Sequence, residues 1–273
     1  MQLTKRKGAQ RRSEIPPDVL VGLNRGRLEA VNLVEWLAVD MPYLLRAILP
    51  DVGLADAADE LGTAADQLAQ EGVSKRIKGI GAALFEALRD HPARETVFEN
   101  LATHTSDTVR AWASFAAQAN PDLPLAERLD AARRFAADWN TGVRENAWDS
   151  FRPHLVEDLE QGIALLVPWV HDPDPNIRRC ASEATRPRGV WTPHIPTLKE
   201  DPEPGLALLE PLRSDPSRYV QNSVANWLND ASKSRPDWVQ AVCARWLEES
   251  PTKETRYIVN RALRTLRKQG AGG

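Results

Sequence analysis

The 273-residue sequence contains little of what metal, redox or membrane chemistry requires. Its two cysteines, Cys180 and Cys243, are too few for a disulfide framework or a zinc site, and they fit a reducing cytoplasm. The longest apolar stretch, residues 162–170, is half of the roughly 18 to 20 residues that a bilayer span needs. The basic start of the chain is followed by no apolar segment, so we expect no secretory signal. These absences predict a cytoplasmic protein without a membrane anchor.

Motifs for nucleotide, metal and acyl-enzyme chemistry are missing as well. Gly79 and Gly81 lack the third glycine and the flanking strand that a dinucleotide-binding loop needs. The five histidines are scattered, with none paired at helical spacing, and no Gly-x-Ser-x-Gly sequence supplies a nucleophilic serine. We therefore predict no metal site and no cofactor, and expect any activity to depend on carboxylates, arginines and aromatic side chains.

Charge of one sign is not in excess, because 35 Lys and Arg stand against 38 Asp and Glu, a net charge of −3. This balance excludes a chain that is basic throughout, but it leaves room for local basic regions. A content of 42% hydrophobic and 27% charged residues is typical of a globular protein rather than a disordered one. Nine tryptophans against three tyrosines and five phenylalanines are unusual, and they make indole rings candidates for a site.

Helical spacing of Ala, Leu, Glu and Arg runs through the chain, with twenty prolines between the segments. When the corners are aligned, an anchoring Val or Ile recurs at intervals of 34, 34, 43 and 38 residues. The first two intervals also match ankyrin and tetratricopeptide repeats, but neither consensus is present. We predict an all-α, right-handed HEAT-like solenoid of helix pairs with a concave groove. The anchors are Val109, Val143, Ile177, Val220 and Ile258.

The repeat predicts one domain over residues 15–268, between a basic flexible tail, residues 1–14, and a disordered tail, residues 269–273. From Pro216 onward ten Lys and Arg stand against five Asp and Glu, and the first twelve residues carry five bases and no acid. Both ends are therefore candidates for binding phosphate. We expect a monomer, although the sequence itself leaves the oligomeric state open.

The repeat register also predicts which side chains line the groove. Residues at +4, +7 and +8 from each anchor share its buried stripe, whereas +2, +6 and +9 lie about 180 to 240° away at about 100° per residue. A solvated helix face is the plain alternative for such a row. The row consists of Ala111, Phe115 and Gln118, then Glu145, Asp149 and Arg152, then Arg179, Glu183 and Arg186, then Asn222, Asn226 and Asn229, and finally Asn260, Arg264 and Arg267.

Two features of this row favour a binding site. Asparagine costs a helix roughly 0.5 kcal/mol relative to alanine, so three asparagines on one face suggest hydrogen bonds to a ligand. In addition, Asp149 and Glu183 each precede an arginine by three residues, and equivalent positions in stacked repeats are neighbours. Two carboxylates flanked by guanidinium groups would then lie side by side. The alternatives are surface ion pairs, worth a few tenths of a kcal/mol, or arginines that cap a helix end.

Two long motifs carry a resemblance to a known family. They are Arg178-Arg-Cys-Ala-Ser-Glu-Ala-Thr-Arg-Pro-Arg-Gly-Val-Trp191 and residues 215–233, and residues 15–20 and 33–37 match as well. Over most of its length the chain is similar to the HEAT-repeat DNA alkylation repair glycosylases of the AlkC/AlkD group, and most of all to the AlkC branch. Some AlkC-like proteins carry a C-terminal immunoglobulin-like domain, which we do not expect here because the sequence ends at Gly273.

The resemblance implies a monofunctional DNA glycosylase that removes cationic alkylated purines, such as 3-methyladenine, from double-stranded DNA. A purine alkylated at N3 or N7 already carries a positive charge, so the leaving base needs no proton. Carboxylates in a partly desolvated groove would stabilise the oxocarbenium-like sugar and orient a water. We assign Glu183 as the leading acid, with Asp149 beside it and Asp230 from the next repeat, and Glu145 competes with Asp149 for its role.

DNA contacts are expected from aromatic, amide and basic side chains near these acids. An indole face attracts a cation by roughly 0.5 to 2 kcal/mol, which favours Trp148 and Trp191, whereas Trp227 lies on the buried stripe and is expected to pack. The alternatives to a glycosylase are a non-catalytic scaffold that binds a protein or peptide, and a lesion-binding protein without activity. The predicted DNA-binding residues are Trp148, Arg152, Arg186, Arg188, Trp191, Tyr219, Asn222, Asn226, Asn229, Lys233, Arg264 and Arg267.

Overall fold

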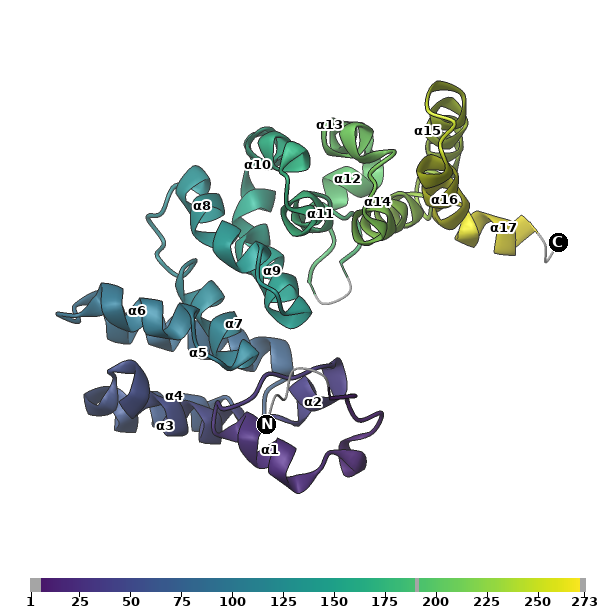
Figure 1. Cartoon of the computed structure of the whole chain (residues 1–273). Coiled ribbons are helices and arrows are strands. Elements are labelled where there is room, and N and C mark those ends of the chain that lie inside the picture. Colours follow the sequence, from purple (N-terminus) through teal and green to yellow (C-terminus); the bar gives the residue numbers. More distant parts are fainter. Residues whose placement is uncertain (1–5, 190–191, 271–273) are drawn as a thin grey trace. The chain divides into compact units, whose positions relative to one another are not determined.

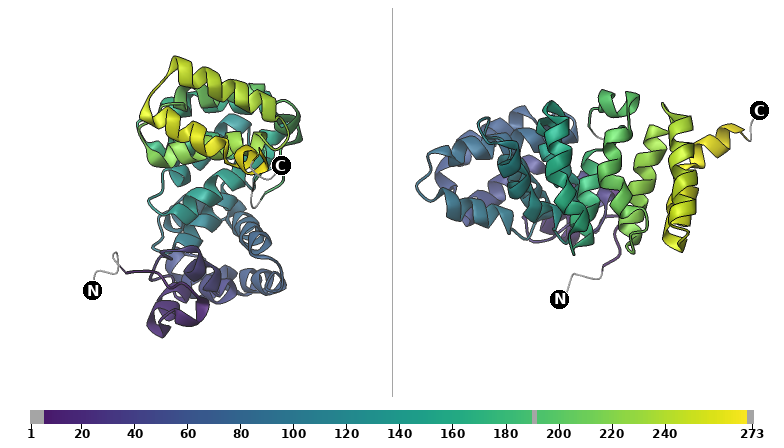
Figure 2. Two further views of the ribbon diagram at one scale, coloured as in Figure 1. Left: turned by 90° about the vertical axis from the view of Figure 1, so that its right-hand side faces the viewer. Right: turned by 90° about the horizontal axis from the view of Figure 1, so that it is seen from above.

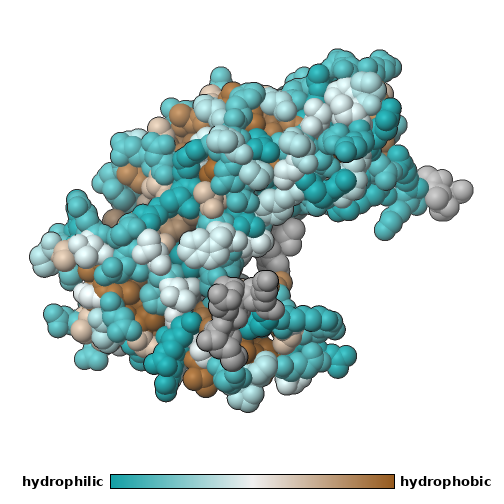
Figure 3. All heavy atoms as spheres, in the orientation of Figure 1, coloured by the Kyte–Doolittle hydropathy of each residue, from teal (hydrophilic) through white to brown (hydrophobic). Residues whose placement is uncertain are grey.

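The computed structural model describes residues 6–189 and 192–270, and these residues form helices and no strand (Figure 1). The all-α prediction is confirmed. The chain divides into two compact units, Met1–Ser150 and Phe151–Gly273, with the boundary inside one long helix. Within the described ranges, no helix combines the length and the apolar character needed to cross a membrane. Hydrophilic side chains cover most of the face drawn in Figure 3, and apolar side chains form small separate areas.

Consecutive helices pack on one another within the first unit. α3 lies against α4, α4 against α5, and α5 runs along α7. The elements of this unit are η2 (Arg12–Glu14), α1 (Pro17–Asn24), α2 (Leu33–Ala38), α3 (Met41–Val52), η3 (Ala55–Ala57), α4 (Ala58–Gln67), α5 (Val73–Arg89), α6 (Arg94–Ala102), α7 (Asp107–Ala116), α8 (Leu125–Ala136) and the first part of α9 (Thr141–Glu157).

In the second unit α11 packs against α14 and α14 against α16, and Figure 2 shows these helices side by side. This succession of layers is the predicted helical repeat. The elements that follow α9 are α10 (Leu159–Leu166), η4 (Val167–His171), α11 (Pro175–Ala184), α12 (Pro196–Glu200), η5 (Glu203–Gly205), α13 (Leu206–Leu209), η6 (Glu210–Leu212), α14 (Arg218–Ala231), α15 (Pro236–Glu249), α16 (Lys253–Ala262) and α17 (Arg264–Gly270).

The five predicted anchors all lie in the core, each at most 1% exposed. Four of them are the third residue of their helix, in α7, α9, α11 and α14, so the corner and the buried stripe start in the same register. The last anchor, Ile258, is the sixth residue of α16, which explains why its corner resembles the others least. Trp227 is fully buried and donates a 3.2 Å hydrogen bond to Thr185 Oγ1, so the prediction that it packs is confirmed.

In four of the five repeats, the residue that follows the anchor fastens its helix to the preceding loop. Arg110, Arg144 and Arg178 each donate from Nη1 to the carbonyl oxygens six and five residues earlier, at 2.6–3.0 Å. In the fourth repeat, Gln221 Nε2 donates to the carbonyl oxygen six residues earlier at 2.7 Å. Because a guanidinium carries five donors in a fixed plane, one arginine satisfies several loop carbonyls at once.

Two of these arginines also reach the next repeat. Arg110 Nε lies 2.7 Å from Asp138 Oδ2, and Arg178 Nε lies 2.6 Å from Asp215 Oδ2. Each aspartate in turn accepts the backbone N–H two residues later, immediately before the next helix. The aspartate side chains are 6% and 4% exposed, so each depends on its guanidinium for charge compensation. We call this contact the inter-repeat arginine–carboxylate bond.

The structure differs from the sequence prediction in two local respects. Pro50 lies inside α3 and Pro153 inside α9, so the prediction that prolines only separate helices is wrong at these positions. A proline removes one backbone hydrogen bond, and a helix held by packing tolerates that loss. The segment expected to be a flexible basic tail makes defined contacts where it is described, because Arg6 pairs with Glu35. Residues 1–5 and 271–273 lie outside the described residues, and the predicted domain limits stay a prediction.

We expect Arg178→Met to lower the free energy of unfolding by about 2 to 4 kcal/mol, because it leaves the buried Asp215 carboxylate and two loop carbonyls without their donor. Urea denaturation measures the change. Arg256→Met is the matched control, since Arg256 is exposed in the same unit, and we expect it to cost less than about 0.5 kcal/mol. Equal effects of the two substitutions would contradict the role of the arginine–carboxylate bond.

Asp107, in the first turn of α7, is 2% exposed, and burial raises the pKa of its carboxyl to about 6. Because this value lies above that of the unfolded chain, stability falls as pH rises from about 4 to about 7. We expect Asp107→Asn to abolish that fall and to raise the free energy of unfolding by about 1 to 2 kcal/mol at neutral pH. Urea denaturation at several pH values tests this, with the exposed Asp122→Asn as control. An unchanged pH dependence would contradict it.

Candidate functional site

Glu183 lies at the end of α11 in the second unit, with its side chain 3% exposed. Its Oε1 lies 3.4 Å from Arg179 Nη2, and its Oε2 accepts a 3.1 Å hydrogen bond from Arg186 Nη1. Burial raises the pKa of this carboxyl, but the charges of the two arginines and a hydrogen bond from Ser223 outweigh it and hold the pKa below the ordinary value. Glu183 is therefore a buried carboxylate that stays ionised at neutral pH.

Asp230, in α14, is joined to Glu183 through a shared guanidinium. Arg186 donates to Asp230 Oδ2 from Nε at 2.9 Å and from Nη2 at 2.7 Å, while its Nη1 bonds to Glu183. Lys233 Nζ lies 3.0 Å from the other carboxylate oxygen of Asp230. The two predicted acids of this unit are thus held on either side of Arg186. We call Glu183, Asp230, Arg179, Arg186, Arg188 and Lys233 the Arg186 cluster; it contains four cations against two anions.

Two more of the predicted arginines hold the loop after α11. Arg188 donates to the Asp230 carbonyl oxygen at 3.2 Å and to Ser234 Oγ at 2.7 Å. Arg152 donates to the carbonyl oxygens of Ala184 at 2.6 Å and Arg186 at 2.8 Å. Arg152 therefore caps the C-terminal end of α11. The sequence had suggested a cap at the end of its own helix, α9. It is 1% exposed, a burial that leaves no surface for the DNA contact expected of it.

The three asparagines of α14 are bonded to the next helix layer. We expected them to bind a ligand, but the structure supplies another reason for asparagine on this face, because each side chain joins α14 to the α16–α17 segment. Asn229 is 2% exposed, so its amide is fully used within the protein. The bonds are Tyr257 Oη to Asn222 Oδ1 at 2.8 Å, Arg264 Nη2 to Asn226 Oδ1 at 2.9 Å, and Asn229 Nδ2 to the Ala262 carbonyl oxygen at 2.9 Å.

The predicted DNA-binding residues Tyr219 and Arg267 differ in how far they are held by other side chains. The Tyr219 ring lies 4.3 Å from the Arg179 guanidinium, so Arg179 is held between this ring and the Glu183 carboxylate. Arg267 is exposed and bonds to Asn260, leaving most of its surface open to solvent. Trp191 falls outside the described residues.

The first unit contains the third predicted acid, Asp149 of α9, with its side chain 11% exposed. Asp149 Oδ2 lies 2.9 Å from Lys78 Nζ of α5, whereas its buried Oδ1 has no hydrogen-bond partner among the described residues. Lys78 also lies 5.6 Å from the Phe115 ring centre. Trp148 is 4% exposed and donates to Glu145 at 3.1 Å. Because Asp149 and Glu183 belong to different units, their predicted approach to each other stays a prediction.

These arrangements suit the electrostatic stabilisation of charge. Within the described part of the chain, no group of three or more His, Cys, Asp or Glu side chains is placed to hold a metal ion. A basic side chain lies beside each of the three predicted acids, namely Arg186 beside Glu183 and Asp230, and Lys78 beside Asp149. Such a site can stabilise a developing positive charge and can bind anionic groups next to it.

A model of the family described as DNA alkylation repair enzyme matches residues 110–266, which is more than half of the chain. The chain belongs to this family. The match includes all three predicted acids. It also includes every anchor except Val109. The family membership confirms the predicted resemblance to the AlkC/AlkD group, while the branch within the group stays a prediction.

Relatives of known sequence or structure cover different shares of the chain. The uncharacterized protein YhaZ of Bacillus subtilis (strain 168) is 45% identical over 119 residues, which is 44% of this chain and 33% of YhaZ. The alkylpurine DNA glycosylase AlkC of Pseudomonas fluorescens, solved bound to DNA containing an abasic site analog, is 27% identical with a TM-score of 0.68. That match covers 84% of this chain and 63% of the AlkC chain, so this chain spans less than two thirds of either relative.

AlkD2 from Streptococcus mutans shares the helical-repeat fold at 21% identity, with a TM-score of 0.56 over 75% of this chain and 96% of AlkD2. The fold of the alkylation repair family is therefore present in this chain.

We expect Arg186→Met to raise the pKa of Glu183, because the nearer of its two guanidinium partners is removed while burial remains. Carbon-detected NMR titration of the side-chain carboxyl measures this value in the folded protein. Arg188→Met is the matched control, since Arg188 bonds to Asp230 and Ser234 and not to Glu183. A Glu183 pKa equally unchanged in both variants would show that Arg186 does not set its ionisation.

Proposed function

We propose that the chain is a DNA glycosylase that hydrolyses the N-glycosidic bond of cationic alkylated purines, such as 3-methyladenine, in double-stranded DNA. The observation that carries this proposal is the pair of buried carboxylates, Glu183 and Asp230, bridged by Arg186 in a member of the alkylation repair family. The relative AlkC, described as an alkylpurine DNA glycosylase, adds support from its complex with DNA. In this proposal the chain acts as a monomer and without a cofactor.

The proposed reaction needs no general acid to protonate the leaving base. The alkylated base carries a positive charge and leaves as a neutral molecule, so the positive charge that develops is on the sugar. An ionised Glu183 would lie against this oxocarbenium-like sugar and align the attacking water, while Asp230 adds negative charge beside it. Because Arg179 and Arg186 keep Glu183 ionised, the carboxylate is ready for this role across neutral pH.

The arginines have a second part in the proposed mechanism. In the free protein they occupy both oxygens of Glu183, which would block access to a substrate. The Arg186 cluster has more cations than anions, so it attracts DNA phosphates, and guanidinium groups pair with phosphate in a planar, two-pronged geometry. We propose that backbone phosphates take over Arg179 and Arg186 and thereby uncover the carboxylate next to the lesion. Binding of the backbone and activation of the acid would then be one event.

Asp149 is proposed as the second acid of the reaction, with Glu145 as the alternative. Its unpartnered Oδ1 retains the capacity to accept a hydrogen bond from water, while Lys78 neutralises the other oxygen. Glu145 already accepts a hydrogen bond from Trp148, which favours Asp149.

We expect wild-type protein to release 3-methyladenine from methylated duplex DNA, detected by chromatography, and Glu183→Gln to reduce the single-turnover rate by at least about 100-fold. Glutamine keeps the shape of the side chain but not its charge. Because the pKa of Glu183 is lowered in the free protein, protonation of this residue is not expected to reduce kcat/KM at neutral pH. Glu248→Gln, an exposed glutamate of α15, is the matched control and is expected to leave the rate unchanged.

Equal rates for wild type and Glu183→Gln would remove Glu183 from the mechanism. If wild-type protein bound methylated DNA but released no base, the protein would instead be a lesion-binding protein. If it bound no DNA, the scaffold alternative would replace the glycosylase.

A further inference from the structure

The end of α1 forms a fixed turn that presents two arginines. Gly26 has a φ of +69°, a left-handed conformation, and Arg27 N–H donates to the Gly22 carbonyl oxygen at 2.9 Å. A Cβ on Gly26 would lie 2.8 Å from His104 Cε1 and from Ile48 Cγ2, so the turn is pressed against both side chains. Arg25 and Arg27 on either side of Gly26 therefore start from a backbone that cannot shift freely.

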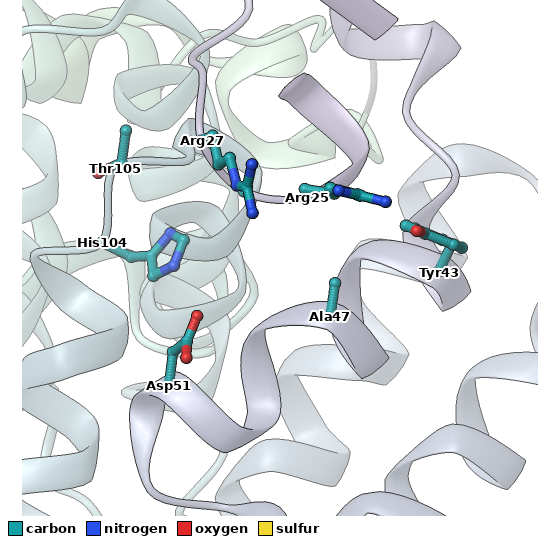
Figure 4. Close-up of a pocket in the computed structure, with 8 residues that line it drawn as sticks. Arg25, Arg27, Tyr43, Ala47, Asp51, His104 and Thr105 are labelled. Atoms are coloured by element: carbon teal, nitrogen blue, oxygen red, sulfur yellow. The ribbon is translucent and has the colours of Figure 1, made fainter. Parts of the chain in front are cut away.

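These arginines line a hollow of about 600 Å³ on the first unit, together with Tyr43, Asp51 and His104 (Figure 4). Both arginines are exposed, and neither has an ion pair or side-chain hydrogen bond within the part of the chain that the structure describes. In Figure 4, Arg25 extends toward Tyr43 and Arg27 points into the hollow near His104. Arg46, Arg89 and Arg134 are also exposed, and each of them pairs with a carboxylate, whereas Arg25 and Arg27 have no such pair among the described residues.

The remaining lining groups are mostly hydrogen-bond donors. His104 Nδ1 accepts the backbone N–H of Ser106 at 3.0 Å, so the neutral ring carries its proton on Nε2 and can donate from there. Burial, together with the charge of Arg110, lowers the pKa of His104, which favours this neutral form. Asp51 is the one carboxylate among the residues that line the hollow, and Figure 4 shows it below the His104 ring.

We propose that this hollow binds a phosphate group of the DNA backbone through the guanidinium groups of Arg25 and Arg27. Guanidinium suits phosphate because it offers paired donors with a permanent charge, and the donors of His104, Tyr43 and Thr105 surround the same space. The hollow is wider than a single phosphate needs and is open to solvent, which leaves room for the sugars on both sides of a phosphodiester. The choice of DNA as the source of the phosphate rests on the proposed function. The site lies in the first unit and shares no residue with the Arg186 cluster.

The test uses the full chain and a fluorescein-labelled, undamaged DNA duplex, with Kd measured by fluorescence anisotropy. We expect the double variant Arg25→Ala/Arg27→Ala to raise Kd about tenfold at about 50 mM salt and to reduce the slope of log K against log salt by about 1 to 2. The matched control is Arg89→Ala/Arg94→Ala, which removes the same charge from the same unit at exposed positions outside the hollow. The control is expected to change Kd less than about twofold. Thermal unfolding checks that both variants are folded.

A Kd and salt slope equal to those of the control variant would overturn the proposal. Inorganic phosphate, added while the His104 ring is followed by NMR, distinguishes the source of the anion. If inorganic phosphate shifts the ring signals but the double variant binds DNA like the control, the hollow takes a free anion, and the proposal for DNA is overturned. Base release is measured separately. A protein that releases no base but loses DNA affinity in the double variant would contradict the proposed glycosylase and support the phosphate site.

Discussion

The fold depends on buried bonds between a guanidinium of one repeat and a carboxylate of the next. Arg110 with Asp138 in the first unit, and Arg178 with Asp215 in the second, use the same geometry at equivalent corners. Each carboxylate also fixes the start of the following helix through a backbone N–H. The anchors attach each helix to the core through hydrophobic contacts, but such contacts have no preferred direction. The charged hydrogen bonds between arginine and aspartate are directional, and they set the register of one helix layer on the next. Losing one partner leaves a buried charge, which makes the contact costly to break.

The proposed chemistry depends on another arginine–carboxylate bond between consecutive layers, the one between Arg186 and Asp230. Arg186 joins Glu183 of one helix to Asp230 of the next layer, so the bond that stacks α11 on α14 also keeps the proposed catalytic carboxylate ionised. In the proposed mechanism, this site would also couple DNA recognition to chemistry, because a phosphate that competes for Arg186 would change the surroundings of Glu183. We infer that stability and activity are balanced at Arg186 and cannot be optimised independently.

The sequence predicted the helices, the five anchors and the buried stripe because these follow from local periodicity. Its prediction for the opposite helix face was less accurate, since that face was treated as open. In fact the next layer covers part of it, so Asn229 and Arg152 serve neighbouring helices. An arginine follows three of the five anchors in the aligned corners, and this recurrence was a signal for the inter-repeat arginine–carboxylate bond. Lys78 gave no such signal, because α5 precedes the first detected corner and its contact with Asp149 spans 71 positions (149 − 78).

A double-mutant cycle between Arg186 and Asp230 tests the central claim most directly. The free energy of unfolding is measured for wild type, Arg186→Met, Asp230→Asn and the double variant, and the coupling energy isolates the pair from the separate effects of each change. A buried bond that links consecutive layers predicts a coupling energy of about 2 kcal/mol or more. A value below about 0.5 kcal/mol would contradict the account, because the Arg186–Asp230 bond would then contribute little to holding α11 against α14.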